Sequence, residues 1–253
     1  YITLEKVLKE YGNDMDGLVT NMTDSTKLNP VIKRFTDKGI AVVTVVNDAP
    51  ESTRNACIVC DDFAAGSTAA ELMYKFCNKK EGQLIVLGGN RYFQNNHESV
   101  MGFISTVNKL MPNTEILENY EFWHEDLLEK QVIKYLTAFD DTLGIYSNCS
   151  RTTLAMCRAM KETGMSGKLH LIGMDVFDEL LPYFEDGTLD ASIYQAPQSQ
   201  GYLGLLTLYY LITGEKKVDT IYKTNVGIAI RGNVKGYISS NSKALTLSDI
   251  TSR

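Results

Sequence analysis

Amide and carboxylate side chains follow six of the apolar, β-branched runs of this sequence, at the point where each run ends. These residues are Asn21, Asn47 with Asp48, Asn90 with Arg91, Asn148, Asp175 and Gln195. Such side chains accept and donate paired hydrogen bonds, which suits neutral molecules rich in hydroxyl groups, such as sugars. In open α/β sheets, ligands bind beyond the carboxyl ends of the strands, so these positions are candidate ligand contacts. Each of them is also a common turn or cap residue, and the pattern alone leaves both interpretations open.

The single tryptophan, Trp123, stands between an expected strand and an expected helix. An aromatic face can stack on the C–H face of a sugar ring, which makes Trp123 a candidate platform for a ligand. The alternative is a side chain that staples the following helix to the core.

Signatures of catalysis and of metal binding are missing from the sequence. It has no G-x-G-x-x-G after a strand, no G-x-x-x-x-G-K-[ST], no G-x-S-x-G, no H-E-x-x-H, and only 3 histidines. Cys57 and Cys60 have C-x-x-C spacing, but they lie along an expected strand, where residues three apart point to opposite faces. We therefore expect buried strand cysteines, no metal site, no cofactor and no enzymatic activity.

Short β-branched runs alternate with segments of helical period, which is typical of βα units around a mainly parallel sheet. Strands are expected at 17–20, 40–46, 56–60, 83–88, 114–120, 143–147, 168–173, 191–195 and 226–230. Helices are expected at 2–11, 28–38, 98–110, 126–139, 152–163, 177–184 and 198–213, with a further helix after Asp61 that runs through Ala64 to Phe76. Asp61 and Ser150 are predicted N-caps, and Gly164 is a predicted left-handed helix stop. Pro182 predicts a short or kinked helix.

The composition is that of a folded globular protein, with 253 residues of which 44% are apolar and 22% charged. A net charge of −6 works against direct binding of nucleic acid, which needs clustered Lys and Arg. The longest nearly uncharged apolar run, 201–213, is shorter than the roughly 20 residues that span a bilayer, so no membrane segment is expected. The odd number of cysteines, 5, favours free thiols in a reducing cytoplasm.

Seven segments stand in a recognisable order along the chain. They are 16–25 (DGLVTNMTDS), 39–45 (GIAVVTV), 48–54 (DAPESTR), 61–66 (DDFAAG), 101–103 (MGF), 171–175 (LIGMD) and 195–201 (QAPQSQG). In this series the chain resembles the sugar-binding domain of lactose-repressor-family transcription regulators and the related ribose-type transport binding proteins, which share the type I periplasmic-binding fold.

The resemblance implies an α/β fold of two similar lobes, each a mainly parallel sheet flanked by helices, joined by three crossover segments. The lobes would comprise residues 1–60 with 196–224 and residues 61–195 with 225–253. Because the chain opens in a helix, where a βαβαβ half begins with a strand, the first βαβ unit is expected upstream of this sequence. A ligand would lie between the lobes, and hinge closure would report its presence.

The resemblance also implies roles for individual residues. Asn21, Asp175 and Gln195 would bind ligand hydroxyls, Trp123 would stack on the ligand, and the loop of Asn47 and Asp48 would face it. The chain departs from the family where Ser99, with His97 nearby, replaces an arginine, and where Cys149 and Ser150 replace an Asn-Asp pair. The predicted ligand-binding set is Asn21, Asn47, Asp48, Asn90, His97, Ser99, Trp123, Asn148, Cys149, Asp175 and Gln195.

The leading hypothesis is a cytoplasmic effector-binding domain of a transcription regulator. A small polyhydroxylated molecule, a sugar or sugar derivative, would change the geometry of a homodimer and hence the DNA affinity of a helix-turn-helix domain outside this chain. The alternative is an extracellular sugar-binding lipoprotein of a transport system, which is expected to be monomeric. A receptor sensor domain ranks third, and an enzyme of flavodoxin-like fold ranks last.

Overall fold

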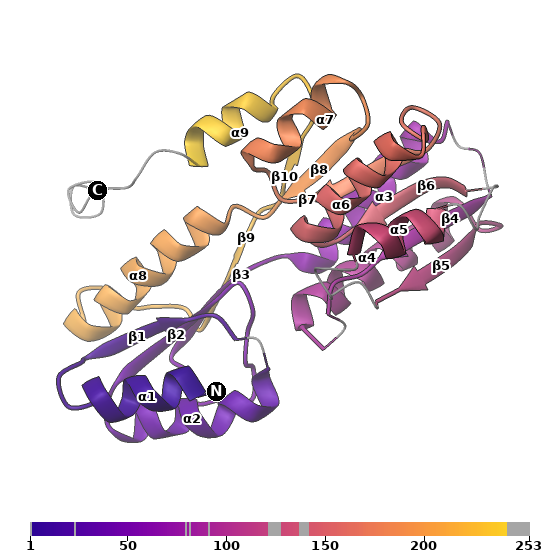
Figure 1. The fold of residues 1–253 in the computed structure, drawn as a ribbon. Coiled ribbons are helices and arrows are strands. Elements are labelled where there is room, and N and C mark those ends of the chain that lie inside the picture. The colour runs from indigo at the N-terminus through magenta and orange to yellow at the C-terminus, as the bar shows by residue number, and fades with distance from the viewer. Residues whose placement is uncertain are drawn as a thin grey trace. The chain divides into compact units, whose positions relative to one another are not determined.

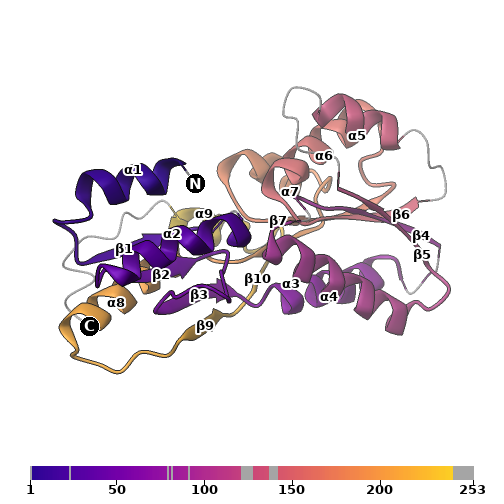
Figure 2. The ribbon, with the colours of Figure 1, turned by 90° about the horizontal axis from the view of Figure 1, so that it is seen from below.

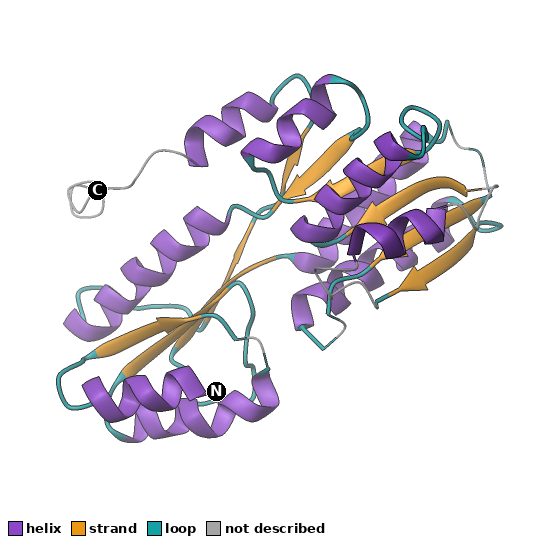
Figure 3. Ribbon diagram, viewed as in Figure 1, coloured by secondary structure: helices purple, strands orange, loops and turns teal. Residues whose placement is uncertain are grey.

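The computed structural model describes residues 2–22, 24–78, 80, 82–90, 92–120, 128–136 and 142–241, and the chain divides into two compact units (Figure 1). The described residues of unit 1 lie within 1–60 and 196–225, and those of unit 2 within 61–195 and 226–241. Each unit is a mainly parallel sheet flanked by helices (Figure 3), which confirms the predicted α/β architecture. Within the described ranges, no helix has both the length and the apolar character needed to cross a membrane.

Unit 1 is built on a four-stranded parallel sheet in the order β1-β2-β3-β9. Its strands are β1 (Gly17–Thr20), β2 (Ala41–Val45), β3 (Ala56–Cys60) and β9 (Ile221–Thr224), and its helices are α1 (Ile2–Tyr11), α2 (Ser25–Asp37) and α8 (Pro197–Thr213). Successive residues of β2 point to opposite faces of the sheet. Val42 joins the apolar cluster of α1 and α2, and Val43 joins the cluster that includes Leu203 and Leu208 of α8. Helices therefore cover both faces of this sheet (Figure 2).

Unit 2 is built on a six-stranded sheet in the order β10-β8-β7-β6-β4-β5, parallel except for β10. Its strands are β4 (Gln83–Leu87), β5 (Glu115–Asn119), β6 (Thr142–Ser147), β7 (His170–Met174), β8 (Ala191–Tyr194) and β10 (Gly227–Ala229). Its helices are α3 (Asp62–Phe76), α4 (Gln94–Leu110), α5 (Leu128–Leu136), α6 (Ser150–Glu162), α7 (Leu181–Glu185) and α9 (Val234–Asn241), with a 3₁₀ turn at Asp178–Leu180. Helices α3 and α4 cover one face, and α5 and α6 cover the other (Figure 2).

The predicted helix signals are correct in part. Asp61 caps α3, since its Oδ1 accepts a hydrogen bond from the Ala64 N–H at 3.1 Å. Gly164 follows α6 with a φ of +66°, and Pro182 lies in a short helix of 5 residues. The prediction for Ser150 is wrong, because α6 begins at Ser150 itself, two residues before the expected start at 152, and Cys149 takes the cap position without a side-chain bond.

Two elements have no counterpart in the predictions, β9 and α9. Both are short, at 4 and 8 residues. Strand β9 is an edge strand whose first three residues are exposed, so it lacks the apolar run that marks a buried strand. Its place in the sheet comes from pairing with β3, more than 160 residues away in the chain, which a local pattern does not reveal.

Two glycines bring the backbones of α3 and α4 together. A methyl group on Gly66 would lie 1.8 Å from the carbonyl oxygen of Ser99, and one on Gly102 would lie 2.1 Å from the carbonyl oxygen of Phe63. No side chain fits at either position without moving a helix. The close contact of the two helices therefore depends on hydrogen as the side chain at these positions.

Replacing Gly66 by Ala is expected to lower the free energy of unfolding by about 2–3 kcal/mol, because the added methyl group must push α4 away. Gly201→Ala is the matched control, since a methyl group on this glycine of α8 meets no atom within 4 Å. Alanine there should stabilise the helix by up to about 1 kcal/mol. Urea unfolding measures both changes, and equal effects of the two substitutions would contradict the packing described.

Candidate functional site

Two asparagines meet at the carboxyl edge of the sheet in unit 1. Asn21 directly follows β1, and Asn47 comes two residues after β2, the neighbouring parallel strand. The Asn47 Nδ2 donates a hydrogen bond to Asn21 Oδ1 at 3.0 Å. Asn47 is 5% exposed, and its Oδ1 accepts no hydrogen bond from any described residue. A buried acceptor without a donor costs about 1–3 kcal/mol, so this oxygen is suited to a donor that a ligand brings.

The backbone at this edge is strained at Val46, the residue directly before Asn47. Val46 has a φ of +68°, which is an outlier for a β-branched residue. Its N–H still pairs with the Ile58 carbonyl at 3.0 Å, and the Asn47 N–H donates to the Val45 carbonyl at 2.8 Å. Such strain persists only where surrounding bonds hold it, and it is concentrated at functional sites. The conformation of Val46 is a signal that the sequence does not carry.

Asp48, also predicted to contact the ligand, is bound to Arg54. Both carboxylate oxygens accept from the Arg54 guanidinium, and Oδ1 also accepts from the Thr44 hydroxyl at 3.0 Å and the Ala49 N–H at 2.7 Å. The side chains of Arg54 and Asp48 are 4% and 11% exposed. Burial alone would raise the pKa of the Asp48 carboxyl, but hydrogen bonds from Arg54 and Cys57, with the Arg54 charge, outweigh burial and lower it. Asp48 therefore fixes its own loop.

Asp175 and Gln195 meet at the carboxyl edge of the sheet in unit 2. They follow the neighbouring strands β7 and β8, and Gln195 Nε2 donates to Asp175 Oδ1 at 2.9 Å. The other carboxylate oxygen, Oδ2, accepts no hydrogen bond from the part of the chain that the structure describes. Burial raises the pKa of Asp175, and the bond from Gln195 acts in the opposite direction. The result is a fixed carboxylate with one oxygen left to accept a ligand hydroxyl.

Asn148 and Asn90 lie together at the next strand ends of unit 2. Asn148 is buried, and both ends of its amide are used: Oδ1 accepts from the Gly89 N–H at 2.8 Å and Nδ2 donates to the Asn96 carbonyl at 2.9 Å. Asn96 Nδ2 in turn donates to the Asn90 carbonyl at 3.1 Å. Asn90 is half-buried, and its Oδ1 accepts from the Tyr92 N–H at 3.0 Å. Asn148 thus holds the loop that carries Asn90 against the start of α4.

The remaining predicted residues occupy different environments. Ser99 is buried, and its hydroxyl shares a 2.6 Å hydrogen bond with Tyr146, whose ring stacks on Phe103. It therefore belongs to the core. His97 lies exposed on α4, and Cys149 is half-buried at the start of α6. Trp123 lies outside the described residues.

The cysteines are free thiols, and the C-x-x-C pair lies along β3 as predicted. Burial raises the pKa of the Cys57 and Cys157 thiols to about 12 and of the Cys77 thiol to about 11. Cys60 is also buried. Thiols of this kind carry almost no thiolate near neutral pH and are inert to oxidation. No group of His, Cys, Asp or Glu among the described residues could hold a metal ion.

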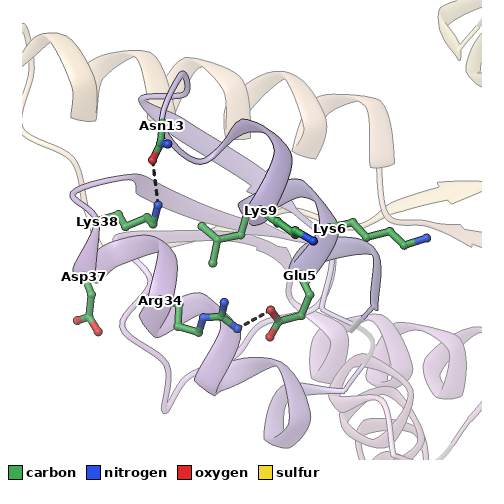
Figure 4. A pocket seen from close by; sticks show the side chains of 8 residues that line it. Glu5, Lys6, Lys9, Asn13, Arg34, Asp37 and Lys38 are labelled. Atoms are coloured by element: carbon green, nitrogen blue, oxygen red, sulfur yellow. Dashed lines mark hydrogen bonds and ion pairs between the residues drawn. The ribbon is translucent and has the colours of Figure 1, made fainter.

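A cavity of about 570 Å³ lies elsewhere in unit 1, between α1 and α2 (Figure 4). It is lined by Glu5, Lys6, Leu8, Lys9, Asn13, Arg34, Asp37 and Lys38. Arg34 forms an ion pair with Glu5, and Lys38 Nζ donates to Asn13 Oδ1 at 3.1 Å. Lys38 stands before β2, so this cavity is at the amino end of the strand, away from Asn47. None of the predicted ligand-binding residues lines it.

Comparison with known proteins places the chain among binding proteins. A family model described as a periplasmic binding protein domain matches residues 9–216. A D-ribose/D-allose-binding protein of Pseudomonas aeruginosa is 25% identical over 228 residues, which cover 84% of this chain and 69% of that protein.

Solved structures show the same fold. A solute-binding protein of an ABC transporter from Burkholderia graminis, in complex with D-arabinose, gives a TM-score of 0.85 at 23% identity, covering 93% of this chain and 82% of that one. One from Agrobacterium vitis with bound D-fucose gives 0.81 at 25% identity, covering 92% and 81%. The named relatives are binding proteins, which confirms the prediction that this protein is not an enzyme.

Replacing Asp48 by Asn is expected to lower the free energy of unfolding by about 3 kcal/mol at pH 7, because it leaves the Arg54 charge buried without a partner. The lowered pKa means that the wild-type contribution is present above the unfolded pKa and is lost as the pH falls through the folded pKa. Asp37→Asn, which breaks the exposed pair with Lys33, should change stability by less than about 1 kcal/mol. Comparable losses for the two variants in urea would contradict this account.

Asp175→Asn should have the opposite effect and stabilise the protein at pH 7. Burial raises the pKa of the folded carboxyl, so ionisation costs folding free energy; the cost begins above the unfolded pKa and is complete above the folded pKa. The gain should shrink as the pH falls and disappear below the unfolded pKa of about 3.9. Urea unfolding between pH 3 and 7.5 measures it. A gain that did not vary with pH would rule out relief of a buried charge as its cause.

Proposed function

Because this chain belongs to the periplasmic binding protein family, we propose that it binds a neutral sugar as the solute-binding protein of a transport system. The observation that carries this proposal is a pair of oxygens that accept no hydrogen bond from the described residues, Asn47 Oδ1 in unit 1 and Asp175 Oδ2 in unit 2. A ligand that satisfies them must bring hydrogen-bond donors. Sugar hydroxyls are donors of this kind, and they can accept bonds from the neighbouring amide groups in return.

The charges of the predicted residues favour an uncharged sugar over a sugar acid or a sugar phosphate. Asp48 is neutralised by Arg54, which leaves Asp175 as the carboxylate that would face the ligand. A second negative charge near this partly buried carboxylate would be repelled, whereas a neutral hydroxyl can donate to it. The relatives named above as binding ribose, allose, arabinose and fucose agree with this class of ligand.

The transport role is supported by the relatives, and the regulator hypothesis receives no support from them. The named proteins bind sugars, and two of them are components of ABC transporters. The cysteine argument for a cytoplasmic location also loses its weight, because buried thiols with raised pKa values do not need a reducing compartment. We therefore place the protein outside the cytoplasm and expect a monomer. A homodimer and a DNA-binding partner domain remain predictions of the regulator hypothesis.

The predicted residues divide into two groups in this proposal. Those assigned to the sugar are Asn21, Asn47, Asn90, His97, Trp123, Cys149, Asp175 and Gln195. Those assigned to support are Asp48, Ser99 and Asn148, whose polar atoms already bind other parts of the protein.

Isothermal titration calorimetry with D-ribose, D-allose, D-arabinose, D-fucose, D-glucose and D-galactose tests the proposal. At least one of them should bind, and its binding should shift the emission of the single tryptophan, Trp123. Asp175→Asn should weaken that sugar about 10- to 100-fold, and Asn47→Ala about 10-fold, because each removes an acceptor. The control Asn13→Ala, in the cavity between α1 and α2, should leave the affinity unchanged.

Three results would contradict the proposal. One is a panel in which no sugar binds the folded protein. Another is full affinity in both Asp175→Asn and Asn47→Ala. The third is a loss of affinity in Asn13→Ala that equals the loss in the other two variants, because the sugar would then occupy the cavity between α1 and α2.

A further inference from the structure

Asp175 adopts a backbone conformation that needs support from its surroundings. Its φ of +68° lies in the left-handed region, which costs a residue other than glycine of the order of 1 kcal/mol or more. Asp175 directly follows β7, so this conformation sets the direction in which the chain leaves the strand and the carboxylate points. The bonds that hold the conformation therefore also aim the carboxylate.

Three hydrogen bonds hold the backbone on either side of this turn. The Asp175 N–H donates to the Ile193 carbonyl of β8 at 2.8 Å, which continues the pairing of the two strands. The Thr153 hydroxyl of α6 accepts from the Met174 N–H at 3.1 Å. The Ser192 hydroxyl of β8 donates to the Asp175 carbonyl at 2.6 Å. Among these, the bond from Ser192 is the one that a side chain makes to Asp175 itself.

Ser192 is an unusual residue for its position. It is fully buried, and the other members of β8 are Ala191, Ile193 and Tyr194, all buried as well. It stands beside Gly173 in the pairing of β7 with β8. A hydroxyl in such a place loses its hydration and is tolerated only when it is hydrogen-bonded. An alanine would fill almost the same volume, so the fold alone does not call for a hydroxyl here.

We propose that Ser192 is a positioning residue of the sugar site, whose hydroxyl holds Asp175 in its left-handed conformation and so keeps the second carboxylate oxygen directed at the ligand. This inference rests on the proposed function for its effect on binding. Its effect on the Asp175 carboxylate does not, because that carboxylate exists in the sugar-free protein. The two effects are therefore measured separately.

Ser192→Ala is the test variant, and Thr188→Val is the matched control. Thr188 is also a fully buried hydroxyl of unit 2, with bonds to Ser166 Oγ at 3.0 Å and Asp186 Oδ1 at 2.7 Å. It precedes β8, whereas Asp175 follows the parallel strand β7, so the two residues are at opposite ends of this strand pair. Both variants should be somewhat less stable than the wild type. Only a residue that positions Asp175 should also change the titration of that carboxyl and the affinity for a sugar.

The first readout is the titration of the Asp175 carboxyl by ¹³C NMR in the sugar-free protein, assigned by its absence in Asp175→Asn. Burial raises the pKa of this group, Gln195 is the side chain that contacts it, and no charged group among the described residues contributes to the shift. In Ser192→Ala the carboxylate should reach solvent more readily, and its pKa should fall towards the ordinary value of about 3.9. Thr188→Val should leave it unchanged.

The second readout is the affinity for the tightest-binding sugar of the panel D-ribose, D-allose, D-arabinose, D-fucose, D-glucose and D-galactose. Ser192→Ala should raise the Kd about tenfold, the factor that one hydrogen bond of ordinary strength represents, and Thr188→Val should not change it. If no sugar binds the wild type, the proposed function fails, and the titration still decides the role of Ser192. An unchanged Asp175 titration in Ser192→Ala overturns the positioning role, as does an unchanged sugar affinity beside a shifted titration.

Discussion

Parallel pairing is the constraint on which the candidate site depends. It brings the carboxyl ends of β1 and β2 to one edge in unit 1, and those of β4, β6, β7 and β8 to one edge in unit 2. Left-handed residues then turn the chain sharply at two of these ends, at Val46 and Asp175. The Val46 N–H stays bonded to the Ile58 carbonyl of β3, and the Asp175 N–H stays bonded to the Ile193 carbonyl of β8. Backbone strain and acceptors without a described donor therefore coincide at these strand ends.

The polar residues at these strand ends fall into two groups, which differ in whether all of their polar atoms have hydrogen-bond partners. Both polar atoms of the Asn148 amide are hydrogen-bonded to the backbone, and both oxygens of Asp48 accept hydrogen bonds from Arg54. Asn47 and Asp175 each keep one oxygen without a donor among the described residues. A folded protein tolerates such an oxygen at a cost, and that cost is recovered when a ligand donates to it. In the proposed site, Asn148 and Ser192 would hold the backbone around these acceptors before a ligand binds.

The sequence predicts most of the architecture because strand runs and helix caps are local. Apolar β-branched runs mark the buried strands, and Asp61 and Gly164 mark helix ends through contacts within a few residues. Strand β9 escapes prediction because its exposed residues have no apolar pattern. In the candidate site, residue types and positions are readable, but the partners are not. Asn148 binds Gly89 and the Asn96 carbonyl, 59 and 52 residues away, and only the fold brings them together. The left-handed conformation of Val46 and the burial of Ser99 against Tyr146 likewise cannot be predicted from the local sequence.

A crystal structure of the protein with its tightest-binding sugar is the most direct test of this account. In that complex, sugar hydroxyl groups should donate to Asp175 Oδ2 and to Asn47 Oδ1, at O···O distances of about 2.5–3.0 Å. Asp48 should stay bound to Arg54. A sugar bound elsewhere, with both oxygens still without a hydroxyl donor, would contradict the proposal that these acceptors bind the ligand.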